Sequence, residues 1–244
     1  MKSKAKIIRI IACAVFIGVF VFSGFEVIKI SREYKQIDDY YDNLQKKFEP
    51  EASSSDSNDY ASDNKVLDLQ AKYPDVLGWL TVDGTNVDYP FVQAKNNDKY
   101  LRHDLDLKYL VAGTLFMDYR CAPDFSDFST VIYGHNMKNS SMFGTIKKFK
   151  NKQFFDENTG GTLYLSDKVY SFQIAAYMIV NSKDDQIYRF GSSTDSERQA
   201  IIDYIKNNSK QYRELNLTTA DRLLILSTCS YDYNGARMVL IARL

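Results

Sequence analysis

Cysteine and histidine are both scarce in this sequence. Its 244 residues include three cysteines and two histidines. So few cysteines exclude a scaffold held together by disulfides. The two histidines, His103 and His135, show none of the short ligand spacings of zinc motifs, either with each other or with Cys229. We therefore expect no metal and no cofactor.

An excess of charge of one sign is also missing. The chain has 31 Lys and Arg residues against 31 Asp and Glu residues. No global electrostatic field therefore points to a nucleic acid as partner. The composition as a whole is that of a globular protein, and the sequence shows no internal repeat.

The basic residues cluster in one place, the N-terminus. The segment MKSKAKIIR is followed by an uncharged apolar run from Ile10 to Phe25. A transmembrane helix needs roughly 20 apolar residues, with a range of about 17–25, and apolar residues on both sides extend the run. A cleaved signal peptide is the competing interpretation, but FSGFEV is a poor cleavage site.

We therefore expect an uncleaved transmembrane signal anchor. Basic residues before the apolar run and the acidic Glu26 after it orient the N-terminus toward the cytoplasm. This pattern predicts a single-pass protein of the cell membrane, held there by its N-terminal anchor. The N-terminus would be cytoplasmic and the folded domain extracellular.

The rest of the chain divides into a stalk, a linker and a folded domain. Apolar residues recur at helical spacing over residues 31–48, which predicts an amphipathic stalk helix. Residues 49–64 are rich in Ser, Asp and Asn. This composition cannot support a hydrophobic core, so we expect a linker. We thus expect a basic tip and anchor at 1–30, stalk and linker at 31–64, and one folded domain at 65–244.

Short strand patterns dominate the folded domain. VLGWLTV and VDYPFVQ flank the turn DGTN, which is typical of a hairpin, and two further β-rich runs close the chain. Helical patterns are confined to residues 64–73, 141–149 and 193–212. The pattern predicts a mainly β, α+β fold, either a closed barrel or a sandwich, with helices packed outside.

Three chemically capable side chains lie at the ends of predicted strands. His135 follows the pattern STVIYG, Cys229 ends the run LLILSTC, and Arg237 opens the last run. These ends could meet on one rim of a barrel. A thiolate is nucleophilic, a histidine can protonate a leaving amine, and an arginine can stabilise an oxyanion. The set favours acyl transfer.

Less specific interpretations exist for each of these residues. A lone cysteine at a strand end is more often a small buried residue, and the histidine and arginine could be ordinary surface residues. The chain would then be a membrane-tethered, non-enzymatic β-barrel module for adhesion or binding. A papain-like protease is disfavoured, because its cysteine precedes its histidine and begins a helix, whereas here His135 precedes Cys229.

The residues around these positions resemble the active-site motifs of sortases, the membrane-anchored cysteine transpeptidases of Gram-positive bacteria. LSTCSYDYNGARMVLIARL is similar to the family's T-L-x-T-C motif, which an arginine follows at the start of the next strand. VIYGHNMKNSSMFGTIKKF is similar to the family's histidine segment, and AGTLFMDYR to the strand and turn before it. The likeness runs from about Val66 to the C-terminus, and the helical stretch 193–212 points to class B.

The resemblance implies a closed sortase-type barrel of about eight strands with peripheral helices. It also implies that Cys229 is the nucleophile, His135 the acid and base, and Arg237 the oxyanion ligand. Such an enzyme cleaves surface proteins after the Thr of a C-terminal sorting motif through a thioester. It then transfers them to an amine of peptidoglycan or of its lipid-linked precursor. Class B members often carry an acidic residue soon after the cysteine, and here Asp232 is the third residue after it.

Three further residues are expected to contact the substrate. Ser227 lies two residues before Cys229, so strand alternation puts both side chains on one face. By the resemblance, Tyr188 and Leu101 are expected to form walls of the peptide site. No role is assigned to Cys121.

Overall fold

The computed structural model describes residues 2–50, 65–192 and 194–244. The chain divides into two compact units, Met1–Tyr40 and Tyr41–Leu244. Most of the predicted linker falls on residues 51–64, which lie outside the described residues.

All the described residues of the first unit belong to one helix, α1 (Lys2–Phe48), which continues past the end of that unit. The prediction of a membrane-spanning anchor is wrong, because no helix among the described residues is both long enough and apolar enough to cross a membrane. Within α1, Glu26 and Lys29 interrupt the apolar surface soon after Phe25. The predicted location, a single-pass membrane protein with a cytoplasmic N-terminus and an extracellular domain, is corrected by the same finding.

The last turns of α1 belong to the second unit. Tyr41, Leu44 and Phe48 are buried at helical spacing, and the Tyr41 hydroxyl donates a hydrogen bond to the carbonyl of Gly113 at 2.5 Å. The Tyr41 ring also meets the ring of Tyr89 edge-on, with the ring centroids 5.0 Å apart. The compact unit therefore begins before the linker, whereas the sequence pattern placed the start of the domain at residue 65.

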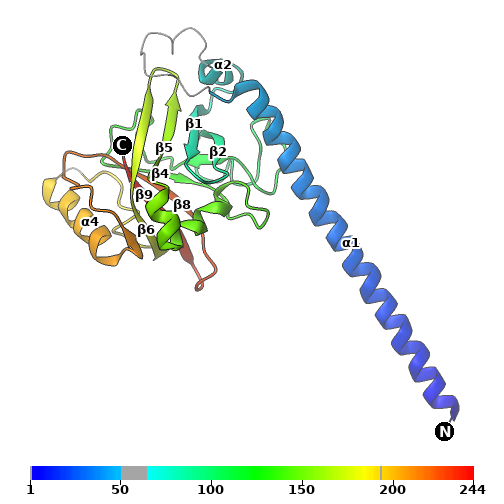
Figure 1. The fold of residues 1–244 in the computed structure, drawn as a ribbon. Helices are drawn as coiled ribbons and strands as arrows, with labels where there is room; N and C mark the ends of the chain where they lie inside the picture. Colours follow the sequence, from blue (N-terminus) through cyan, green and yellow to red (C-terminus); the bar gives the residue numbers. More distant parts are fainter. Residues whose placement is uncertain (1, 51–64, 193) are drawn as a thin grey trace. The chain divides into compact units, whose positions relative to one another are not determined.

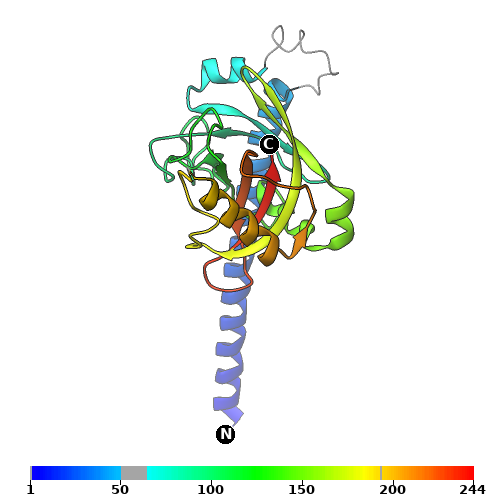
Figure 2. The same ribbon diagram turned by 90° about the vertical axis from the view of Figure 1, so that its left-hand side faces the viewer.

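Among the described residues, nine strands form one sheet that closes on itself. The curvature of the sheet can be followed in Figures 1 and 2. The order is β5-β1-β2-β3-β4-β8-β9-β6-β7, and a further antiparallel pairing between β5 and β6 closes a barrel of eight strands, with β7 paired to the outside of β6. The predicted fold class is confirmed. The strands are β1 (Val76–Val82), β2 (Asp88–Val92), β3 (Leu115–Met117), β4 (Ser129–Tyr133), β5 (Gly160–Leu165), β6 (Val169–Asn181), β7 (Gln211–Tyr212), β8 (Leu223–Cys229) and β9 (Ala236–Arg243).

The peripheral helices follow local sequence signals. The three helical patterns correspond to α2 (Lys65–Lys72), the 3₁₀ helix η1 (Phe143–Lys150) and α4 (Asp195–Asn208). A short helix, α3 (Lys152–Glu157), was not expected from the sequence. The start of α4 is fixed by a capping box. The side chain of Thr194 accepts a hydrogen bond from the backbone N–H of Glu197, and the Glu197 carboxylate accepts one from the backbone N–H of Thr194.

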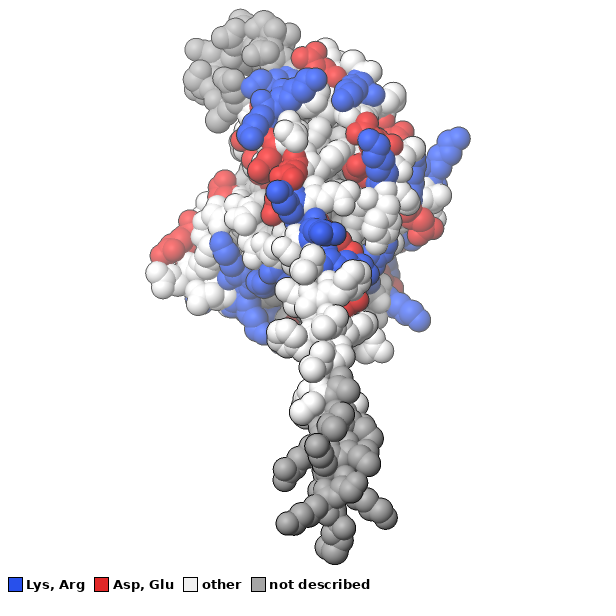
Figure 3. Space-filling model, turned by 90° about the vertical axis from the view of Figure 1, so that its right-hand side faces the viewer, with Lys and Arg blue, Asp and Glu red and all other residues white. Residues whose placement is uncertain are grey.

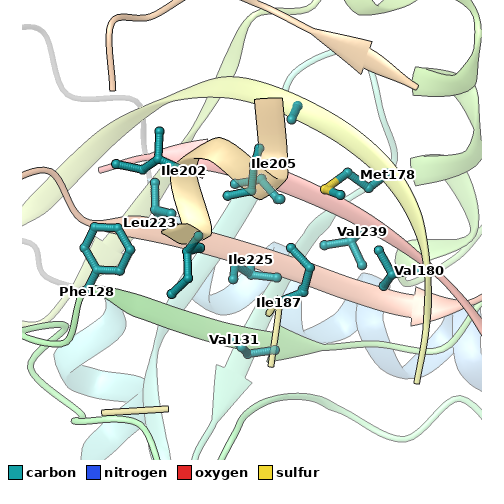
Figure 4. Close-up of a cluster of buried hydrophobic side chains, with 13 residues drawn as sticks. Phe128, Val131, Met178, Val180, Ile187, Ile202, Ile205, Leu223, Ile225 and Val239 are labelled. Carbon is teal, nitrogen blue, oxygen red and sulfur yellow. The ribbon is translucent and has the colours of Figure 1, made fainter. Parts of the chain in front are cut away.

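One hydrophobic cluster packs α4 against the barrel, as Figure 4 shows. Ile202 and Ile205 of α4 lie over Val131 of β4, Ile225 of β8 and Val239 of β9, and all five side chains are buried. Burying an aliphatic side chain of this size stabilises a fold by about 1.5–3 kcal/mol relative to leaving it exposed. The cluster therefore holds in place the three strands whose ends carry His135, Cys229 and Arg237.

The surface carries both signs of charge. Basic and acidic side chains are interspersed over the face that Figure 3 shows. Short ion pairs occur within the second unit, including Lys206 with Glu214 at 2.7 Å and Lys152 with Asp156 at 2.6 Å. The balanced composition of the chain thus extends to this face of the protein.

Candidate active site

Strand register brings the ends of β4, β8 and β9 to one edge of the sheet. β4 and β8 run parallel, and Tyr133 lies opposite Ser227. His135 and Cys229 each follow two residues later, so they lie at the same end of this strand pair. β9 runs antiparallel to β8, and Arg237 lies directly opposite Cys229. The three predicted residues are therefore neighbours on one rim of the barrel.

A pocket of about 300 Å³ opens at this rim. This volume lies at the lower end of the usual range for ligand-binding pockets. Aromatic and aliphatic side chains form part of its wall, and polar groups form the rest. All six residues that the sequence singled out line it: Leu101, His135, Tyr188, Ser227, Cys229 and Arg237.

His135 is half-buried at the start of the loop after β4. Burial, together with the positive charge of Arg102, lowers the pKa of His135 from its ordinary value, although a hydrogen bond to the backbone of Ala112 opposes the shift. The imidazole is therefore mostly neutral at pH 7. A neutral imidazole can accept a proton from a thiol and later donate it to a leaving group.

Cys229 is the last residue of β8, and its thiol is free and exposed. The side-chain amide of Asn136 donates a hydrogen bond to the backbone carbonyl of Cys229 at 2.9 Å. Asn136 follows His135 directly in the chain. One side-chain hydrogen bond thus ties the histidine loop to the cysteine strand, and the motif comparison had not identified this residue.

Arg237 is half-buried at the start of β9, between β8 and β6. One of its guanidinium nitrogens, Nη1, donates to the carbonyl of Ala236 at 3.2 Å. A guanidinium carries five N–H donors, so this bond leaves several for other acceptors. A positively charged donor set opposite Cys229 could stabilise negative charge that develops on a carbonyl oxygen bound there.

Tyr188 and Ser227 form one wall of the pocket together. The two hydroxyls share a hydrogen bond of 2.7 Å, which joins the segment after β6 to β8. Burial raises the pKa of Tyr188 to about 12, so the phenol stays protonated at neutral pH. Its ring stacks on that of Tyr133, with centroids 6.4 Å apart and 27° between the planes. Leu101 lies elsewhere on the lining, with 40% of its surface exposed.

Two other residues with reactive side chains, His103 and Cys121, do not line the pocket. The Nδ1 atom of His103 lies 2.9 Å from the carbonyl oxygen of Lys99, and His103 forms an isolated bridge with Tyr109. Cys121 is buried, and burial raises the pKa of its thiol to about 12. At neutral pH Cys121 is therefore a thiol and not a thiolate, which makes it a poor nucleophile.

The acidic residue near the cysteine has partners of its own. Asp232 accepts a hydrogen bond from the hydroxyl of Ser230 and forms an ion pair with Lys150 at 3.4 Å. These contacts order the turn between β8 and β9 and connect it to the end of η1.

A polar network around the buried carboxylate of Asp118 was missed in the sequence. The carboxylate of Asp118 lies just after β3 and accepts hydrogen bonds from Arg120, Asn97 and Tyr133. Asn97 and Tyr133 also line the pocket. The only sequence signal was the pair of opposite charges in MDYR, which by itself does not reveal that the carboxylate is buried.

Comparison with known proteins gives a consistent result. The sortase domain family model matches residues 80–244. A sortase B of Listeria monocytogenes is 32% identical over 235 residues, which covers 94% of this chain and 94% of that protein. The crystal structure of Clostridium perfringens sortase B is 36% identical with a TM-score of 0.69, and the match covers 72% of this chain and 97% of that one. A Staphylococcus aureus sortase B–substrate complex is 26% identical with a TM-score of 0.76, covering 87% and 97% respectively.

The closed barrel and the family match together show that this protein is a cysteine transpeptidase. The chain belongs to the sortase family. Its similarity to sortases B from three organisms places it in class B of that family. The resemblance noted in the sequence is confirmed. The alternative of a non-enzymatic adhesion or binding module is set aside.

Proposed function

We propose that this enzyme cleaves surface proteins after the threonine of a C-terminal sorting motif and joins them to an amine of peptidoglycan or of its lipid-linked precursor. The observation that carries the proposal is the strand register that puts His135, Cys229 and Arg237 on the rim of one pocket. The S. aureus sortase B neighbour is a substrate complex, which supports a protein substrate of the same kind here.

Cys229 is the nucleophile of this reaction. His135, neutral at pH 7, accepts the thiol proton as the sulfur attacks the carbonyl carbon of the motif threonine. A new S–C bond forms, and the carbonyl oxygen becomes an oxyanion. Arg237, opposite Cys229, donates hydrogen bonds to that oxyanion.

Collapse of the tetrahedral intermediate breaks the peptide C–N bond. The imidazolium of His135 gives its proton to the leaving nitrogen, which departs as a free amine, and a thioester remains on Cys229. The acceptor amine then attacks the thioester carbonyl, and His135 removes its extra proton. Expulsion of the sulfur with return of a proton restores the free thiol and releases the new amide.

The pocket wall suits a short peptide that contains proline. Leu101, Tyr133 and Tyr188 present apolar surface that can pack against a proline ring, while Ser227 presents a small polar group beside the cysteine. The resemblance to class B sortases implies a proline-bearing motif that ends in Thr-Gly or Thr-Asn, and we infer a substrate of this kind.

Incubation of the full chain with such peptides tests the proposal directly. We expect scission after the threonine and, when an amine acceptor is present, a ligated product that mass spectrometry detects. A peptide with the same composition in scrambled order serves as the control. Cleavage of the scrambled peptide at the same rate would indicate a general protease and would contradict the proposed reaction.

Arg237 provides a graded test of the oxyanion role. We expect Arg237→Ala to lower kcat/KM by roughly 10²–10³-fold, the usual cost of removing one oxyanion donor. Arg237→Lys keeps the charge but loses the planar fork of N–H groups, so it should remain far below the unaltered enzyme. Peptide cleavage rates measure both variants. Full activity of Arg237→Lys would show that only the charge matters and would contradict the hydrogen-bonding role.

The pKa of His135 predicts how activity depends on pH. Because the pKa of His135 is lowered, the imidazole stays neutral and able to accept the thiol proton to below its ordinary pKa of about 6.5. As pH falls through the lowered pKa, His135 becomes protonated and kcat/KM should fall. Arg102→Gln removes a positive charge and should move this acidic limb to higher pH. An acidic limb that lies above pH ~6.5 in the unaltered enzyme would contradict the assignment.

A further inference from the structure

The carboxylate of Asp118 holds two side chains of the pocket wall. It is fully buried, and it accepts from the Asn97 side-chain amide at 3.0 Å and from the Tyr133 hydroxyl at 3.1 Å. A buried carboxylate needs its hydrogen-bond donors, because an unpaired one is costly to bury. Turning either side chain toward another partner would leave Asp118 short of a donor. The network thus restricts both residues to one orientation.

Arg120 connects the same carboxylate to a third segment of the wall. Its Nε and Nη2 atoms donate to the two oxygens of Asp118 at 2.8 Å each, in a bidentate pair. The guanidinium lies over the ring of Phe190, 3.7 Å from its centroid. Phe190 comes two residues after Tyr188 in the segment that follows β6. The ion pair therefore fixes the guanidinium against which this segment packs.

The electrostatics agree with an ionised Asp118. Burial alone would raise the pKa of its carboxyl, but the hydrogen bonds from Arg120 and Asn97 outweigh burial and hold the pKa below its usual range. The carboxylate is therefore negatively charged at neutral pH and accepts from Arg120, Asn97 and Tyr133.

Three pocket-lining residues from distant parts of the chain depend on this network. Asn97 and Tyr133 bind Asp118 directly, and Tyr188 stacks on Tyr133. The register of β4, β8 and β9 places His135, Cys229 and Arg237 by a separate set of backbone hydrogen bonds. A change in the network should consequently disturb the wall before it disturbs the reacting groups.

We propose that Asp118 and Arg120 are positioning residues that set the affinity of the enzyme for its sorting peptide without touching the peptide. The inference rests on the proposed function, because it concerns the same peptide site. With the network intact, the wall is ordered before the peptide arrives, so less conformational entropy is lost on binding. Without it, the peptide must order Asn97, Tyr133 and Tyr188 itself.

Steady-state cleavage of the proline-bearing peptide by the full chain tests this inference. We expect Asp118→Asn and Arg120→Lys each to raise KM roughly tenfold while kcat stays within about twofold, the pattern of lost ground-state binding. Arg120→Lys keeps the charge but cannot reproduce the bidentate pair. Asp124→Asn removes an exposed carboxylate from the same loop and should leave both constants unchanged.

Tyr133→Phe provides a second test of the inference in case Asp118→Asn does not fold. It removes only the hydroxyl that binds Asp118 and keeps the ring that stacks on Tyr188, so we expect a smaller rise in KM, of roughly threefold. In the double variant Asp118→Asn/Tyr133→Phe the two effects should be less than additive, because both act through one hydrogen bond. Thermal melting identifies the variants that are folded.

Two results would overturn the inference. One is an unchanged KM in folded Arg120→Lys and Tyr133→Phe variants, and the other is a loss of kcat at constant KM. Failure of the proposed function would give a different result, because the unaltered enzyme would then not cleave the peptide at all. That result would contradict the inference as well.

Discussion

Replacement of Cys229 by alanine is expected to abolish both cleavage and ligation of a sorting peptide. No other group at the rim can form the thioester, so kcat/KM should fall by roughly 10⁴-fold or more, as it does when other enzymes lose a catalytic nucleophile. Cleavage of a fluorogenic peptide measures the loss. Mass spectrometry of the intact protein should show an acyl adduct on the unaltered enzyme and none on Cys229→Ala.

Cys121→Ala is the matched control for this experiment. The thiol of Cys121 is buried, with a pKa raised to about 12, and it lies outside the pocket lining. We expect this variant to keep its activity and to form the same acyl adduct. Residual turnover by Cys229→Ala, or an adduct carried by Cys121, would show that the nucleophile had been assigned to the wrong residue.

Replacement of His135 by alanine should cause the second largest loss. The imidazole moves the proton in both half-reactions, first from the thiol and then to the leaving amine, so its removal affects acylation and transfer alike. We expect kcat/KM to fall by roughly 10³-fold or more. The acidic limb of the pH profile should disappear with it, because that limb reports the protonation of His135.

His103→Ala is the corresponding control, since it removes the other histidine of the chain. His103 contacts the carbonyl of Lys99 and is not part of the pocket lining. Its loss should leave most of the activity intact. Equal losses at His103 and His135 would mean that the general acid and base had not been identified.

Much of the fold follows from local patterns in the sequence. Alternating and β-branched runs predicted the strands, and the Ser/Asp-rich start of residues 193–212 predicted the capped helix α4, because such signals depend on neighbours within a few residues. The same logic placed His135, Cys229 and Arg237 at strand ends. That the three ends share a rim was inferred from their positions at strand ends, and the register of β8 with β4 and β9 supplies its geometric reason.

Local patterns were misleading at the N-terminus. The apolar run from Ile10 to Phe25 predicted a membrane anchor, yet no described helix is long and apolar enough to cross a membrane. The Ser/Asp-rich linker likewise suggested that the folded domain starts after it. Tyr41 instead forms a hydrogen bond with Gly113, a residue far along the chain, and no periodicity around Tyr41 indicates that partner.

The sequence by itself determined the class of fold, the sortase motifs and the three residues proposed for the chemistry, because each is encoded by contiguous residues. Only the tertiary structure decided what stands behind the pocket wall. Asn97, Asp118, Tyr133 and Tyr188 come from four separate segments, and their hydrogen bonds and ring contacts exist only once the barrel has closed. Burial of the Asp118 carboxylate makes its hydrogen bonds to Arg120, Asn97 and Tyr133 necessary, and that burial is a property of the packed chain, which the spacing of two charged residues does not reveal.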